Sequence, residues 1–117
     1  MKILIIDDDS LDLFINKKIL GAEFEVEGFT SYEDGSSWIE SNTFDVALID
    51  YYLGHGIHAH DVLKKIVDRK GTDFKALVLS NYVDDKQTNE LKVAGFADVI
   101  LKPITIESFK NKIKSLS

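Results

Sequence analysis

Several residue types are scarce or missing in this chain, and each absence excludes a class of protein. The 117 residues include no cysteine, which excludes disulfide bonds and thiolate chemistry. The apolar runs are only a few residues long, far short of the roughly 20 residues of a transmembrane helix. The first residues, MKILIIDDD, reach acidic side chains too early for a signal peptide. These features predict a cytoplasmic protein that does not enter a membrane.

Positive charge is also in short supply. The chain has 14 Lys and Arg residues against 20 Asp and Glu residues, so its formal net charge is −6. A surface of that sign repels nucleic-acid phosphates and anionic membrane headgroups, and neither is expected as a partner. With 44% hydrophobic and 29% charged residues, the composition is that of a globular protein. The length is typical of a single domain, which we expect to span residues 1–117.

Strand-like and helix-like hydrophobic patterns alternate along the chain. Short apolar or alternating segments predict strands at 2–6, 24–29, 44–50, 75–80 and 97–101. Helical spacing of apolar residues predicts helices at 10–20, 60–70 and from 106 onwards. A capping box formed by Ser31 and Asp34 predicts a helix at 31–42, and Gly95 would close a helix at 84–95. Continuous apolar runs are typical of parallel strands covered on both faces, whereas 24–29 alternates like an edge strand. The pattern predicts an α/β fold, a doubly wound five-stranded parallel sheet with helices on both faces.

The helix predicted at 10–20 is expected to pack on the sheet through one apolar face. Residues with the appropriate helical spacing are Leu11, Phe14, Ile15 and Ile19. We therefore expect these four side chains to be buried.

Polar side chains stand at the ends of four predicted strands. They are Asp7, Asp8 and Asp9 after the first strand, Asp50 after the third, Ser80 after the fourth, and Lys102 after the fifth. Taken singly, helix capping, a turn or a solvated surface charge would explain each of them. Ligands of such sheets bind beyond the carboxyl ends of the strands, so this shared position favours a joint site.

The residue types at this edge indicate phosphoryl chemistry. Two carboxylates about 4 Å apart repel by roughly 4 kcal/mol at an effective dielectric constant near 20, so clustered acids favour a bound cation. Mg²⁺ suits carboxylates and phosphate oxygens, and a carboxylate can attack phosphorus to form an acyl phosphate. The Lys102 ammonium and the Ser80 hydroxyl would then bind other phosphoryl oxygens.

Four spaced motifs together resemble the receiver domain of bacterial two-component response regulators. They are Asp7-Asp8 after ILII, Asp50 after VALI, Ser80 after LVL and Lys102-Pro103 after VIL. The resemblance covers essentially the whole chain. It implies that residues 1–117 are a receiver domain with a flavodoxin-like sheet in the order 2-1-3-4-5. It also implies a cis peptide bond between Lys102 and Pro103.

The resemblance implies a role for each site residue. Asp50 would be the phosphoacceptor, and Ser80 and Lys102 would complete the catalytic set. Mg²⁺ would be held by Asp7, Asp8, Asp50 and the backbone carbonyl of Tyr52, with Asp7 acting mostly through water. The phosphoryl transfer and its later hydrolysis would be self-catalysed, so the chain would not be a conventional enzyme.

The same resemblance implies the partners. A histidine kinase or a histidine phosphotransfer protein would donate the phosphoryl group, and a downstream protein would read the phosphorylated state. A second copy of the chain would be a further partner, in a homodimer formed on phosphorylation. The loop after Ser80, the fourth helix and the fifth strand would form the reporting surface.

The sequence departs from the receiver pattern at several positions. The loop after the acceptor, YYLGHGIHAHD, is one residue longer than usual and has neither a proline nor an Asp-Gly turn. Val99 stands where many receivers carry a switch Tyr or Phe, and Asn81 replaces a small residue. Tyr52 and Tyr82 occupy the positions that flank the path of the attacking water, and we expect them to slow dephosphorylation.

The histidines of that loop allow a second interpretation. His55, His58 and His60 have an H-x-x-H-x-H spacing that a zinc or nickel site can use. The chain has no further His or Cys to complete a four-ligand shell. The favoured alternative is a partner surface that responds to mild acid.

Two other functions remain open from the sequence. Asp7-Asp8-Asp9 also satisfies the Asp-x-Asp pattern of haloacid-dehalogenase-like phosphatases, with Asp7 as the nucleophile. That family needs an acidic pair after the lysine, and only Glu107 follows Lys102. The second alternative is a pseudo-receiver, a docking module that is not phosphorylated, which the altered loop and Val99 keep open.

Overall fold

Five strands and five helices alternate along the part of the chain described by the computed structural model, residues 1–82 and 84–116. The strands are β1 (Lys2–Ile6), β2 (Glu25–Phe29), β3 (Val46–Asp50), β4 (Lys75–Ser80) and β5 (Asp98–Leu101). The helices are α1 (Ser10–Gly21), α2 (Tyr32–Ser41), α3 (Ala59–Lys70), α4 (Asp85–Val93) and α5 (Ile106–Ser115). Each element agrees with its predicted range to within two residues.

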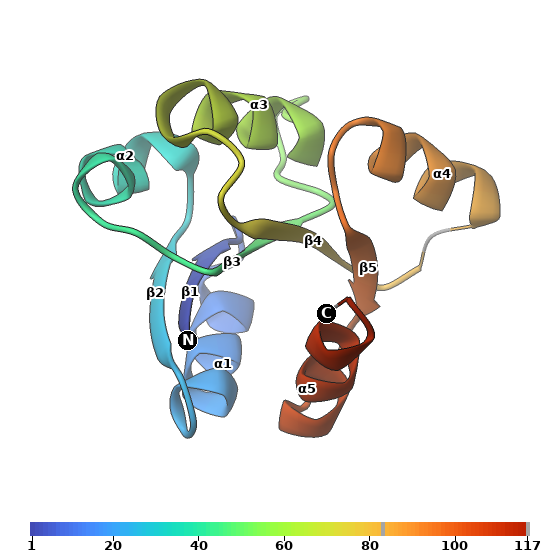
Figure 1. Cartoon of the computed structure of the whole chain (residues 1–117), viewed down its shortest axis with the longest axis horizontal. Coiled ribbons are helices and arrows are strands. Elements are labelled where there is room, and N and C mark those ends of the chain that lie inside the picture. The colour runs from blue at the N-terminus through green and yellow to red at the C-terminus, as the bar shows by residue number, and fades with distance from the viewer. Residues whose placement is uncertain (83, 117) are drawn as a thin grey trace.

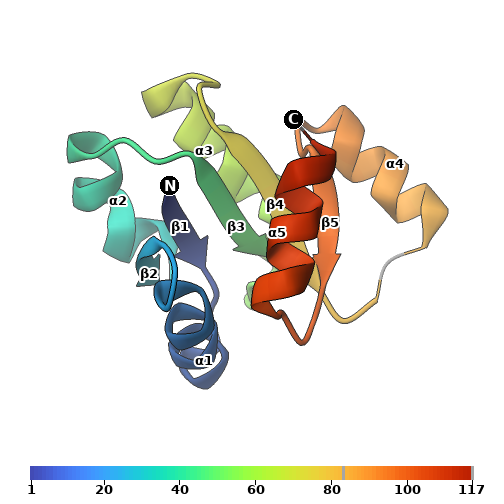
Figure 2. The ribbon, with the colours of Figure 1, turned by 60° about the horizontal axis from the view of Figure 1, so that its bottom comes forward.

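The strands form one parallel sheet in the order β2-β1-β3-β4-β5. Helices α2, α3 and α4 cover one face, and α1 and α5 cover the other (Figure 1). Figure 2 shows the second face, with α1 near the β2 edge and α5 across β4 and β5. The predicted doubly wound fold, strand order and edge position of β2 are confirmed. No helix in the described part of the chain is long and apolar enough to cross a membrane.

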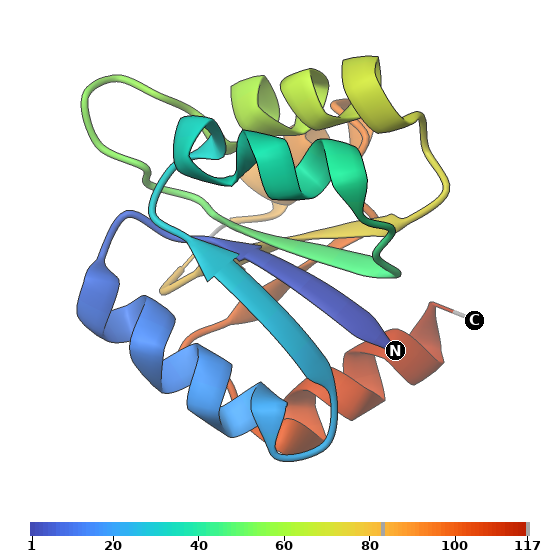
Figure 3. The ribbon, with the colours of Figure 1, turned by 90° about the vertical axis from the view of Figure 1, so that its left-hand side faces the viewer.

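Two apolar cores lie on the two faces of the sheet, as the separate helix layers in Figure 3 indicate. Leu4 and Ile6 of β1 contribute to the core beneath α2, α3 and α4, whereas Ile3 and Ile5 contribute to the core beneath α1 and α5. Successive strand residues point to opposite faces, so a strand covered on both sides is apolar throughout. All five residues of β3 are buried, including Asp50 at its carboxyl end.

Helix α1 does not bury the face that its apolar spacing predicts. Its buried residues are Leu13, Asn16 and Leu20, and Ile19 is partly buried. The exposed fractions of the predicted core residues are 66% for Leu11, 57% for Phe14 and 43% for Ile15. The cause lies in β2, where Gly28 leaves room for Leu13: a Cβ at Gly28 would lie 2.5 Å from Leu13 Cδ1. The lack of a side chain at Gly28 therefore determines which face of α1 packs on the sheet.

Candidate functional site

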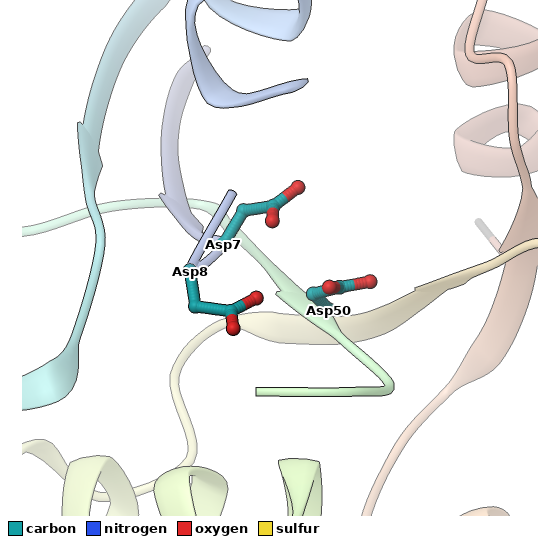
Figure 4. A group of neighbouring side chains, drawn as sticks. All are labelled: Asp7, Asp8 and Asp50. Atoms are coloured by element: carbon teal, nitrogen blue, oxygen red, sulfur yellow. The ribbon is translucent and has the colours of Figure 1, made fainter. Parts of the chain in front are cut away.

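Strand register brings the acidic side chains together. Ile6 of β1 pairs with Ile49 of β3. Asp7 and Asp50, the next residue after each, therefore lie side by side at the ends of adjacent parallel strands. Asp7, Asp8 and Asp50 each offer one carboxylate oxygen, and the three oxygens lie within 4.8 Å of one another. Figure 4 shows the three carboxylates gathered beyond β1 and β3. The predicted convergence of acids from two strands is confirmed.

These carboxylates differ in their surroundings. Asp7 is fully buried, Asp50 is 7% exposed, and Asp8 is exposed. Asp7 Oδ1 accepts a hydrogen bond of 3.0 Å from the Asp9 backbone N–H. Asp7 Oδ2 is buried and has no hydrogen-bond partner among the described residues. A buried carboxylate oxygen without a hydrogen bond is costly, and a cation bound among these oxygens would offset that cost. The donor set therefore fits a hard, oxygen-preferring ion such as Mg²⁺.

Lys102 supplies the positive charge of the site. Its Nζ lies 3.0 Å from Asp50 Oδ1, 3.4 Å from Asp12 Oδ2 and 3.6 Å from Asp7 Oδ2. The Lys102 backbone N–H donates a 2.9 Å hydrogen bond to the Ser80 carbonyl, which continues the β4–β5 ladder to the end of the sheet. The Lys102–Pro103 peptide bond is cis, as predicted. The lysine thus reaches the carboxylates of two other strands from the end of β5.

Burial and mutual charge shift the pKa values of these groups. Burial raises the pKa of Asp7 to about 6, opposed by the Asp9 N–H and reinforced by the charge of Asp50. Burial also raises the pKa of Asp50, although the Lys102 hydrogen bond opposes the shift. For Lys102, burial alone would lower the pKa, but its hydrogen bond to Asp50 and the nearby carboxylates outweigh burial and raise it. The ammonium therefore stays charged while the buried acids resist ionisation.

Ser80 lies at the same edge with its hydroxyl turned toward its own loop. Ser80 is buried, and it is the residue after Leu79, which pairs with Asp50. Its Oγ donates to the Tyr82 carbonyl at 3.0 Å and accepts from the Tyr82 N–H at 3.2 Å. Ser80 thus stands at the end of β4, as the sequence predicts. In this structure, however, its hydroxyl is engaged by backbone groups.

The loop after Asp50 folds against the acidic cluster. Tyr52 forms an antiparallel bridge with His58, and a turn between them has Gly54, His55 and Gly56 at positive φ of 71°, 52° and 73°. A Cβ at Gly54 would lie 2.9 Å from Asp8 Oδ2, so the backbone approaches the acid closely there. Glycine is required here for both its φ and its lack of a side chain. The Tyr52 and Tyr82 side chains are 75% and 74% exposed. The Tyr52 carbonyl as a metal ligand stays a prediction.

The histidines do not have the geometry of a metal site. The rings of His58 and His60 are stacked, with centroids 5.3 Å apart and planes inclined by 5°. An imidazole binds a metal through the in-plane lone pair of a nitrogen, so two parallel stacked rings do not point at one ion. Within residues 1–82 and 84–116, the group suited to a metal is Asp7, Asp8 and Asp50, without a histidine. In this stretch the residue that belongs to the metal-suited group is therefore Asp50, and its role as the functional residue stays a prediction.

Two features of the site were missed by sequence reasoning. Asp12, in the first turn of α1, places its carboxylate 3.4 Å from Lys102 Nζ. Gln87 of α4 donates from Nε2 to the hydroxyl of Tyr51 at 3.2 Å, and it also forms a capping box with Asp84. The position of Asp12 one turn after Asp8 was a usable signal for the first feature. The second requires the packing of α4 against the end of β3, which spacing alone does not give.

Comparisons with known proteins identify a matching family and similar folds. The response regulator receiver domain family model matches residues 3–114. A CheY-like response regulator receiver domain protein from Methanospirillum hungatei is 29% identical, with TM-score 0.80, over 97% of this chain and 90% of that chain. A two-component response regulator from Clostridium difficile is 24% identical, with TM-score 0.83, over 99% of this chain and 94% of that chain.

A further similar structure contains a modified residue. It is a response regulator protein from Burkholderia pseudomallei with a phosphorylated aspartic acid, calcium ion and citrate. It is 17% identical, with TM-score 0.80, over 97% of this chain and 71% of that chain. A search of curated proteins found no match. Because the family match spans nearly the whole sequence, the chain belongs to the receiver domain family of two-component response regulators.

Proposed function

We propose that residues 1–117 act as one receiver domain that accepts a phosphoryl group on Asp50 with the help of Mg²⁺. The observation that carries the proposal is the Asp50 carboxylate, which lies 3.0 Å from Lys102 Nζ and in one cluster with Asp7 and Asp8. This arrangement pairs a nucleophilic carboxylate with groups that neutralise a phosphoryl oxygen. Phosphorylation then changes which proteins the domain binds.

Each residue has a definite task in this reaction. An oxygen of Asp50 attacks phosphorus while the bond from phosphorus to the donor imidazole nitrogen breaks, and the imidazole leaves with that electron pair. Lys102 binds a phosphoryl oxygen through its ammonium, and Ser80 binds another after its hydroxyl leaves the Tyr82 carbonyl. Asp8 and Asp50 would hold Mg²⁺ directly, Asp7 through water, and Tyr52 through its carbonyl. The bound ion supplies positive charge to the phosphoryl oxygens.

Accessibility supports Asp50 over Asp7 as the nucleophile. The side chain of Asp50 is 10% exposed, whereas that of Asp7 is 0% exposed, so of these two carboxylates Asp50 is the one that an incoming donor can reach. Lys102 Nζ is also nearer to Asp50, at 3.0 Å, than to Asp7, at 3.6 Å. Membership of the receiver family also supports this assignment over the phosphatase alternative. The aspartyl phosphate in the Burkholderia pseudomallei structure supports the same type of acceptor.

The retained site also favours a phosphorylated receiver over a pseudo-receiver. Asp7, Asp8, Asp50 and Lys102 converge, and none of these positions has lost its charge. Val99 is 8% exposed within the core and carries no ring that can change between buried and exposed positions. We assign signal transmission instead to the Ser80–Tyr82 hydrogen bonds and to the Tyr51–Gln87 hydrogen bond, which both connect the site to the segment around α4.

The partner surfaces follow from what lies beside the site. Helix α1 begins next to Asp9 and exposes Leu11, Phe14 and Ile15. Exposed apolar side chains grouped near a reactive residue suit a partner that must approach that residue. We place the histidine-containing donor on this face of α1. The downstream protein, or a second copy of the chain after phosphorylation, would bind the surface of α4 and β5.

Intact-mass measurement after incubation with acetyl phosphate and Mg²⁺ tests the proposal. We expect the wild type to gain the mass of one phosphoryl group, and Asp50→Asn to gain none. Asp34→Asn, a carboxylate of α2 that hydrogen-bonds Thr30, is the matched control and should behave as wild type. Labelling that survives Asp50→Asn and disappears in Asp7→Asn would support the phosphatase. An unmodified wild type would support the pseudo-receiver.

A further inference from the structure

Lys102 contacts a third carboxylate that the phosphorylation chemistry does not use. Asp12 lies on α1, and its Oδ2 is 3.4 Å from Lys102 Nζ, between the distances of Asp50 and Asp7. The side chain of Asp12 is 45% exposed, whereas that of Lys102 is 14% exposed. The lysine is therefore held among its partners, and Asp12 is the most exposed of the three carboxylates that contact it. Asp12 stands outside the group of acids suited to a cation.

The charges show what this contact does to an incoming phosphoryl group. Asp7, Asp12 and Asp50 contact a single ammonium, and Asp8 lies in the same acidic cluster as Asp7 and Asp50, so the site already has an excess of negative charge. A phosphoryl group brings about two further negative charges at neutral pH. An ammonium has three N–H donors, and a phosphoryl oxygen that binds Lys102 must compete with the carboxylates already there. Asp12 is the competitor on the exposed side.

We infer that Asp12 is a positioning residue that draws Lys102 toward α1 and opposes the entry of dianionic phosphoryl donors. The inference rests on the proposed phosphorylation of Asp50 and deepens it, because it names a residue that restrains the reaction at that site. Asp12 thereby biases the domain toward its unphosphorylated state. A partner whose own positive side chain pairs with Asp12 releases Lys102 for the phosphoryl group, so the restraint also favours donors that bring such a charge.

The role of Asp12 in the helix cap is separable from this effect. The cap of α1 uses the backbone N–H of Asp12, which donates to Asp9 Oδ1 at 3.0 Å. Asp12→Asn keeps that N–H and nearly the same side-chain shape, and it removes only the charge. Asp12→Glu keeps the charge. Glu107→Gln, in the first turn of α5, removes a carboxylate elsewhere and is the matched control for the change in net charge.

The test compares two small phosphoryl donors by intact-mass kinetics, with thermal unfolding to confirm that each variant is folded. With dianionic acetyl phosphate, we expect Asp12→Asn to be phosphorylated about threefold to tenfold faster than wild type. With phosphoramidate, which carries less negative charge, the gain should be smaller. Added salt should reduce the gain because it screens the Asp12 charge. Asp12→Glu and Glu107→Gln should remain close to wild type.

Three other results would contradict either the role of Asp12 or the proposed function. If Asp12→Asn reacts with acetyl phosphate at the wild-type rate or more slowly, Asp12 does not restrain the reaction, and the proposed function still stands. A gain that is equal for both donors, or that persists at high salt, excludes the charge-based explanation. If no variant acquires a phosphoryl group, the proposed function fails and this inference fails with it.

Discussion

The side chains at the strand ends of this site and those in its loops are held in place in different ways. Asp7, Asp50 and Ser80 are buried at the ends of strands whose register is fixed by backbone pairing. Tyr52 and Tyr82 come from the loops that follow β3 and β4, and their side chains are mostly exposed. Strand ends thus place the reacting groups, whereas loops control what reaches them. Changes at strand ends should abolish the chemistry, and changes in loops should alter its rate.

The largest effect is expected from Lys102→Met. The substitution keeps most of the apolar stem but removes the charge that contacts Asp50 at 3.0 Å. Loss of one preorganised electrostatic contact typically lowers a rate by about 10²- to 10³-fold. Phosphorylation kinetics with acetyl phosphate measure the change, and Lys110→Met, which removes a surface pair with Glu23, is the control. A reduction of less than tenfold would show that Lys102 is not part of the reacting set.

The next effect concerns the pH dependence of stability without Mg²⁺. The pKa of Asp7 is raised from 3.8 to about 6, so the folded protein binds this proton more tightly than the unfolded chain. The contribution of protonated Asp7 to the free energy of unfolding is complete below about pH 4 and is lost as the pH rises through 6. It amounts to at most about 3 kcal/mol. Urea unfolding between pH 4 and 7 should show the decline in wild type and a smaller decline in Asp7→Asn. Identical profiles would show that Asp7 ionises normally.

A smaller effect is expected from Gly54→Ala in the loop. The new Cβ would lie 2.9 Å from Asp8 Oδ2 and should displace that carboxylate. Gly56→Ala is a matched control because its φ of 73° resembles the 71° of Gly54, yet a Cβ there would meet nothing within 4 Å. Both variants should lose about 1 kcal/mol of stability from backbone strain. Only Gly54→Ala should also bind Mg²⁺ more weakly, by roughly tenfold. Equal Mg²⁺ affinities in calorimetric titrations would exclude contact between this loop and the metal ligands.

The smallest effect is expected from the tyrosines. A Tyr52→Ala, Tyr82→Ala double variant should release its phosphoryl group about threefold faster, a change of well under 1.4 kcal/mol in the barrier. The reason is easier approach of water to the acyl phosphate. Phosphate release after removal of the donor measures the rate, and Val93→Ala, at a 90% exposed position on α4, is the control. A double variant that decays no faster than wild type would end the idea of a tyrosine barrier.

Sequence reasoning succeeded where backbone pairing determines position. The apolar runs located the strands, and parallel register then brings Asp7, Asp50 and Lys102 together, because strand ends in one sheet are neighbours. The edge position of β2 followed from its alternating sequence, and the cis bond before Pro103 followed from the family resemblance.

Sequence reasoning failed where packing between elements decides. Phe14 was expected in the core but is exposed, because the apolar spacing on α1 allows either of two faces to be buried. Gly28 of β2, which leaves room for Leu13, determines which face packs on the sheet. The contact of Asp12 with Lys102 joins residues 90 positions apart. The spacing of Asp12 from Asp8 indicates that Asp12 is near the site, but only the fold shows that its partner is Lys102. The hydroxyl of Ser80 bonds to Tyr82 because that loop folds back on itself. Tertiary context therefore determined the details that modulate the site.

The most direct test of the account is a crystal structure with Mn²⁺ in place of Mg²⁺, located by anomalous scattering. Both ions prefer octahedral oxygen ligands, so Mn²⁺ reports the same site. We expect a manganese ion bound by the carboxylates of Asp8 and Asp50, beside Asp7. A protein saturated with Mn²⁺ whose ion lies elsewhere, or whose Asp50 carboxylate is turned away from it, would contradict the account.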